Sequence, residues 1–194
     1  MSAADEAAIA RVRVALTDAA ARLAAAGART EALAEYVPPT RVLLVPRPER
    51  LRPLGTVWRL GVLLLMAEGA DDTASTTGDA AADIQAPSPA LFATGSLTRA
   101  HEPGRTTFIA ASAERRRQLR VAAFRGHYPP GTSVNFDAAP IPLDASLVGA
   151  SGPLTVRDGA AFVRWVPSNP DALTDFDPYL TERVALLTDP PQGA

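Results

Sequence analysis

The sequence GTVWRLGVLLLM, Gly55–Met66, is the most apolar stretch of the chain, and its length and pattern decide the fold class. Its uninterrupted apolar part, Val62–Ala67, has six residues, whereas a membrane-spanning helix needs about 20. Successive side chains of a strand point to opposite faces, and both faces become apolar towards the end of this stretch. We therefore expect one central strand, Thr56–Met66, covered on both sides, with Gly61 at a bulge or close backbone contact.

Helical patterns flank this strand in the sequence. The first 27 residues place apolar side chains three and four apart, which predicts an amphipathic helix that stops near Gly27. Thr30 is expected to cap a short second helix, Glu31–Tyr36, which the following proline pair ends. Two further helices are predicted, over residues 112–126 and Tyr179–Leu187.

Strand patterns fill much of the remainder. They cover Arg41–Val45, Leu91–Arg99, Thr106–Ala110, residues 132–137 and Leu154–Val166. The last is a hairpin, because Asp158-Gly159 suits a type I′ turn. Regular strand–helix–strand alternation is missing. The sequence thus predicts an α+β fold with a largely antiparallel sheet of about six strands, an N-terminal helix, one internal helix and a C-terminal helix.

The same patterns divide the chain into segments. We expect an N-terminal helical segment over residues 1–37, a single α+β domain over 41–188 and a tail over 189–194. Residues 67–90 carry five acids, no base and many small side chains, which predicts a disordered acidic insertion in the turn of an antiparallel hairpin.

The chain contains no Lys and no Cys, and its 19 basic residues are all Arg. This usage, with abundant Ala, is typical of a bacterium with a GC-rich genome. It excludes a lysine base, a Schiff base, a cysteine nucleophile, a disulfide and cysteine-based metal sites. The N-terminus lacks the apolar run of a signal peptide, so we expect a cytoplasmic protein.

Charge patterning bears on the partners. The net charge is −2, and without the five acids of residues 67–90 the chain has 19 bases and 16 acids. Such a balance gives no strong field for nucleic acid, and we expect neither a nucleic-acid partner nor a membrane. Five arginines crowd the internal helix (Arg115, Arg116, Arg117, Arg120 and Arg125). They form either an anion or acidic-partner surface or an ordinary solvated helix face.

Catalytic groups are few. The two histidines, His101 and His127, have no metal-ligand spacing, and we expect no metal and no cofactor. Asp137 ends the motif NFD, residues 135–137, near the end of a strand. His127 and Asp137 are the candidate catalytic pair of a hydrolase, while a helix-dipole contact and a turn are their ordinary structural roles.

Four segments carry a resemblance to known proteins: WRLGVLLL, LFATGSLTRA, AERRRQLRVAAFRG and GASGPLTVRDGAAFVRW. Together they resemble small, mostly uncharacterised proteins of high-GC actinobacteria, some of which are labelled glutaminase. The resemblance covers about residues 41–187 and implies an amidase-type activity. The Ser-x-x-Lys pair of one glutaminase class and the Cys nucleophile of another are both missing here, so no catalytic residue is carried over.

These observations favour a non-catalytic module that binds a protein partner or a second copy of itself, with a small amidase or glutaminase-like hydrolase as the alternative. The expected contact surface is the apolar seam of the N-terminal helix, which contains Ile9, Val12, Leu16 and Leu23. Such a seam either docks on its own domain or pairs with another chain.

Overall fold

The computed structural model describes residues 1–42, 45–69, 89–103, 111–166, 169 and 171–190. It contains three α-helices, α1 (Ala3–Ala25), α2 (Ala111–Arg125) and α3 (Phe176–Thr188), and a short 3-10 helix, Ala145–Leu147. The predicted α+β class with three helices and mostly antiparallel pairing is confirmed. No helix in the described ranges is both long and apolar enough to cross a membrane.

The main sheet has seven strands in the order β7-β8-β1-β4-β5-β6-β9. Their bounds are β1 Glu31–Val37, β4 Arg50–Leu60, β5 Leu63–Gly69, β6 Leu91–Ala93, β7 Ser96–Arg99, β8 Ser133–Phe136 and β9 Ala139–Pro140. All neighbours pair antiparallel except β1 and β8, which are parallel. The expectation of about six antiparallel strands is therefore corrected to a mixed sheet of seven.

This sheet curls back on itself. Two residues, Thr94 and Gly95, separate β6 from β7, and two, Asp137 and Ala138, separate β8 from β9. Because β6 pairs with β9 and β7 with β8, the chain from β6 to β7 and the chain from β8 to β9 form two bent strands that run side by side. The strands β1, β4, β5 and β6 pair in that order, and the chain then bends from β6 into β7. Because β7 pairs with β8 and β8 pairs with β1, the sheet closes on itself, as in a small barrel.

The two faces of the curled sheet bury different clusters. Leu33, Val57 and Leu64 are fully buried together, with Met66, Phe92 and Ala138 against them, and these residues come from the strands and from the bend between β8 and β9. Trp58 and Leu60 alternate with Val57 along β4 and instead join the cluster that contains α1 and α3. The cluster around Leu33, Val57 and Leu64 therefore lies inside the curled sheet, and the helices pack outside it.

The stretch predicted as one central strand is a tight hairpin. β4 ends at Leu60, β5 starts at Leu63, and these two residues are opposite each other. Gly61 has φ +67°, which suits the first position of a two-residue type II′ turn. Gly61 makes a close contact with a side chain rather than with another backbone segment, because a Cβ on Gly61 would lie 2.3 Å from the Tyr179 hydroxyl. That hydroxyl donates to Leu60 O at 2.8 Å and accepts from Val62 N at 3.1 Å.

The short helix expected over Glu31–Tyr36 is wrong, because these residues form β1. Side chains alternate between the two faces of this strand. Ala32 and Ala34 pack with α2, whereas Leu33 points into the curled sheet. Pairing with β4 on one side and β8 on the other outweighs the local helix propensity of Glu, Ala and Leu.

Three smaller predictions have mixed outcomes. The Asp158-Gly159 hairpin joins β10 (Leu154–Arg157) to β11 (Ala160–Arg164), and both turn residues have positive φ as expected. In place of the strand Arg41–Val45, the structure has two short strands, β2 (Thr40–Val42) and β3 (Val45–Arg47), which pair antiparallel. Most of the acidic insertion (residues 70–88), the whole strand predicted at 106–110 and the last four residues of the tail lie outside the described residues.

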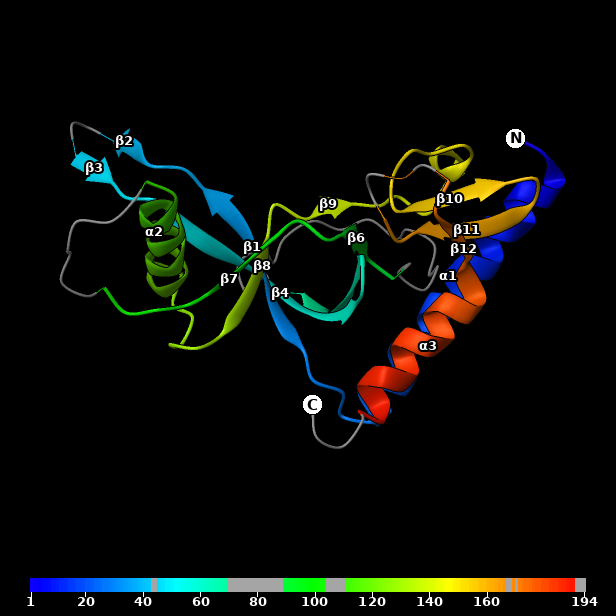
Figure 1. Cartoon of the computed structure of the whole chain (residues 1–194), viewed down its shortest axis with the longest axis horizontal. Helices are drawn as coiled ribbons and strands as arrows, with labels where there is room; N and C mark the ends of the chain where they lie inside the picture. Colours follow the sequence, from blue (N-terminus) through cyan, green and yellow to red (C-terminus); the bar gives the residue numbers. More distant parts are fainter. Residues whose placement is uncertain (43–44, 70–88, 104–110, 167–168, 170, 191–194) are drawn as a thin grey trace, which may run out of the picture.

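The seam of α1 is internal. Ile9, Val12, Leu16 and Leu23 are each at most 4% exposed and belong to one cluster with α3, β4, β5, β10 and β11. A third strand, β12 (Leu173–Asp175), pairs with β11 beside them. Figure 1 shows α1 and α3 at one end of the molecule and α2 at the other. The seam expected to hold a partner is therefore occupied by the protein's own core.

We predict that Leu16→Ala lowers the free energy of unfolding by about 2–5 kcal/mol, because it opens a cavity in a closed core. The matched control is Val14→Ala on the same helix, whose side chain is 61% exposed and whose loss should cost under about 0.5 kcal/mol. Urea unfolding of both variants measures this. Equal stability of the two variants would contradict the packing of α1.

Candidate functional site

Helix α2 is held firmly on the sheet. Val121, Ala122 and Ala123 are buried, and the last two pack against Leu51 of β4 and Val134 of β8. At the end of the helix, a Cβ on Gly126 would lie 1.9 Å from the carbonyl oxygen of Leu51, so only glycine allows this approach. The helix therefore presents its other faces in fixed positions.

Two arginines of α2 are paired with acids. Arg115 Nη1 lies 2.7 Å from Glu49 Oε2 and its guanidinium lies 5.4 Å from the centre of the Tyr36 ring. Arg117 Nη2 lies 2.8 Å from Glu114 Oε1. Burial alone would raise the pKa of Glu49, but hydrogen bonds from Tyr36 and Arg115 outweigh it and lower that pKa. These two arginines are neutralised within the protein.

A different set of arginines lines a groove between α2 and β7, which we call the arginine groove. Its first part has a volume of about 260 Å³ and is lined by Leu97, Thr98, Arg99, Arg116, Leu119, Arg120 and Ser133. The adjoining part has a volume of about 390 Å³ and is lined by Arg99, Ala100, His101, Arg120 and Gly131. The two parts share Arg99 and Arg120, and among the residues that the structure describes neither lining includes an acid.

The groove arginines keep their charges available. Within the described ranges, the side chains of Arg99 and Arg120 make no ion pair and no hydrogen bond to protein. Arg116 donates from Nε to Ser112 O at a long 3.4 Å, which leaves the rest of its guanidinium free. Three uncompensated guanidinium groups beside the hydroxyls of Thr98 and Ser133 form a site suited to carboxylate or phosphate oxygens.

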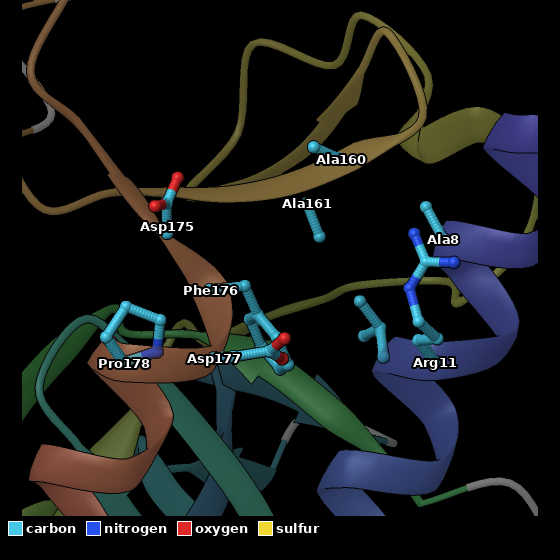
Figure 2. A pocket seen from close by; sticks show the side chains of 9 residues that line it. Ala8, Arg11, Ala160, Ala161, Asp175, Phe176, Asp177 and Pro178 are labelled. Carbon is cyan, nitrogen blue, oxygen red and sulfur yellow. The ribbon is translucent and has the colours of Figure 1, made fainter.

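Another cavity, of about 300 Å³, lies between α1, β11 and the start of α3. Figure 2 shows Arg11 on one side of it and Asp175 and Asp177 on the other. Arg11 Nη2 donates to Gly159 O at 2.9 Å, and Asp5 accepts from Gly159 N at 3.1 Å, so Asp5 and Arg11 fasten the β10–β11 turn to α1. The two aspartates stand at the N-terminus of α3, where they stabilise the helix dipole. The charged residues around this cavity thus have structural roles, and we do not assign it a function.

Asn135, within the NFD motif, also has a structural role. It is 1% exposed, accepts from Arg59 Nη1 at 2.7 Å and donates from Nδ2 to Glu31 Oε2 at 2.7 Å. These bonds join β8, β4 and β1, so that the amide ties the parallel pair to its neighbour. The groups are mutually satisfied, which is how buried polar side chains are normally accommodated.

The candidate catalytic residues are not in contact. His127 and Asp137 are both exposed, and no hydrogen bond joins them. Both occupy the left-handed region, with φ +66° and +55°, one just after α2 and the other at the bend between β8 and β9. His101, in contrast, lines the arginine groove. In the part of the chain that the structure describes, no group of three or more His, Asp or Glu side chains is placed to hold a metal ion.

The sequence alone indicates two of the three groove arginines. Arg116 and Arg120 are four residues apart, so their position on one helix face can be read from the sequence. Arg99 lies on β7, and only the tertiary fold brings it to α2. Comparison with protein-family models, curated proteins and solved structures found no match for this chain.

Tyr128, the residue after His127, offers a test of how α2 is attached. Its hydroxyl donates to Leu33 O at 3.2 Å, and burial raises its pKa to about 12. The neutral phenol therefore contributes stability fully below pH 10, the pKa of an unfolded tyrosine, and this contribution is lost as pH rises through 12.

We predict that the wild-type protein loses stability more steeply than Tyr128→Phe between pH 10 and pH 12, because only the wild type carries the half-buried Tyr128 phenol, whose ionisation folding opposes. Urea unfolding at several pH values measures both slopes, and spectrophotometric titration should lose one late tyrosine ionisation in the variant. Identical slopes for the two proteins would contradict this attachment.

Proposed function

We propose that this protein is a non-catalytic interaction module that binds an acidic segment of a partner protein in the arginine groove. The observation that carries the proposal is the set Arg99, Arg116 and Arg120, which lines one groove in which no described residue is acidic. The contact surface thus moves from the buried seam of α1 to the opposite end of the molecule.

The contrast between paired and unpaired arginines supports this function. Codon bias explains why the basic residues are Arg, but it does not explain why Arg115 and Arg117 have acidic partners and the groove arginines have none among the described residues. Like charges held close together in a concave surface repel one another, and a bound anion relieves that repulsion. Carboxylates match the planar fork of the guanidinium group.

The alternative, an amidase or glutaminase-like hydrolase as the actinobacterial resemblance implies, has less support. It needs a nucleophile and a base in mutual reach, and His127 and Asp137 are not in hydrogen-bond contact. Self-association through the groove is also disfavoured, because it would bring two sets of arginines together. We place the module in the bacterial cytoplasm, since a chain without cysteine suits a reducing compartment.

A labelled, blocked peptide in which glutamate and valine alternate is a suitable probe. We predict that Arg116→Gln and Arg120→Gln each weaken its binding roughly tenfold, the effect of losing one charge-assisted hydrogen bond. Fluorescence anisotropy in low salt measures the affinity, and high salt should weaken it.

The control is Arg22→Gln, which removes the same charge from the exposed last turn of α1 at the other end of the molecule. It should leave the affinity nearly unchanged. A loss as large as that of the groove variants would mean that only net charge matters, and this result would refute the site.

A further inference from the structure

Strand β7 is an edge of the main sheet that runs along the arginine groove. It stands at one end of the strand order, and within the described ranges only β8 pairs with it. Three of its four residues, Leu97, Thr98 and Arg99, line the groove, and the Leu97 side chain is 52% exposed. An exposed edge strand carries backbone groups that can pair with another chain.

The register shows which backbone groups face the groove. Ala100 N donates to Thr132 O at 2.9 Å, and Arg99 is opposite Ser133 in the next pair along the ladder. Hydrogen-bonded and non-hydrogen-bonded pairs alternate in an antiparallel ladder, so Thr98 bonds towards β8. The N–H and C=O groups of Leu97 and Arg99 therefore point away from β8, towards the free edge.

We propose that the acidic partner segment binds as an extended strand that adds to the free edge of β7. This inference rests on the proposed function and deepens it, because it names the backbone mode of recognition. Main-chain hydrogen bonds to Leu97 and Arg99 supply affinity, and side-chain pockets supply the preference for sequence.

The surroundings define the pattern of the segment. Thr98 is opposite Val134, whose side chain packs with α2, so side chains of the added strand on that face meet Arg116 and Arg120. Side chains on the other face lie beside Leu97 and Arg99. A segment with acidic residues on the α2 face and an apolar residue next to Leu97 is complementary to both faces.

A second copy of this chain is a poorer occupant of the edge. Pairing β7 with its own copy would place Arg99 of one chain near the arginines of the other without an intervening acid. Like charges directly opposite in a sheet destabilise the pairing. Charge complementarity therefore favours an acidic segment of a different protein.

Backbone methylation of the peptide tests strand addition. In the alternating glutamate–valine peptide, N-methyl groups on the amides that face β7 should weaken binding at least about tenfold, and methyl groups on the intervening amides should leave it nearly unchanged. Leu97→Pro should weaken binding similarly because it removes one outward N–H, whereas Leu97→Ala keeps that group and should bind far better.

The outcomes separate the two proposals. If the arginine variants weaken binding but the position of the methyl group makes no difference, strand addition is overturned and the proposed function stands. If the arginine variants also have no effect, both fall. If light scattering finds a dimer that Leu97→Pro dissolves, the occupant is a second copy and the acidic-segment proposal is overturned. Should Leu97→Pro fail to fold, the methylated peptides still decide the question.

Discussion

The close approach of Gly95 to the carbonyl of Asp137 is the constraint from which the rest of the architecture follows. A Cβ at Gly95 would lie 2.2 Å from that oxygen. Only glycine therefore lets the β6–β7 segment and the β8–β9 segment touch where both bend. Because they bend together, β6 stays paired with β9 while β7 stays paired with β8. The sheet can then close, and closure creates an interior that Leu33, Val57 and Leu64 fill.

Closure also explains why the helices lie at opposite ends. A curled sheet of short strands offers its outer surface in patches rather than as one plane. Helices α1 and α3 pack on one patch around Trp58 and Leu60. Helix α2 packs on another around Leu51 and Val134. The buried seam of α1 packs against the first patch, and the groove lined by Arg99, Arg116 and Arg120 lies beside the helix on the second.

Elements set by residues close together in the sequence could be predicted from it, and elements set by distant residues could not. The helices α1, α2 and α3 and the Asp158-Gly159 hairpin are encoded by neighbouring residues, and their predictions were correct. The turn at Gly61 was missed because Leu and Val continue the apolar pattern on either side of it. β1 was missed because its partners β4 and β8 are distant in the sequence. In the same way, the sequence shows Arg116 and Arg120 on one helix but cannot show Arg99 beside them.

The geometry of closure also singles out β7 among the sheet's two end strands. The other, β9, has two residues, and its Pro140 lacks a backbone donor, so it is a poor template for pairing. β7 has four residues and no proline, and its outward groups belong to Leu97 and Arg99. An arginine on an edge strand usually discourages pairing with other chains. Here it stands among further unpaired arginines, and the same charge that repels a second copy attracts an acidic strand.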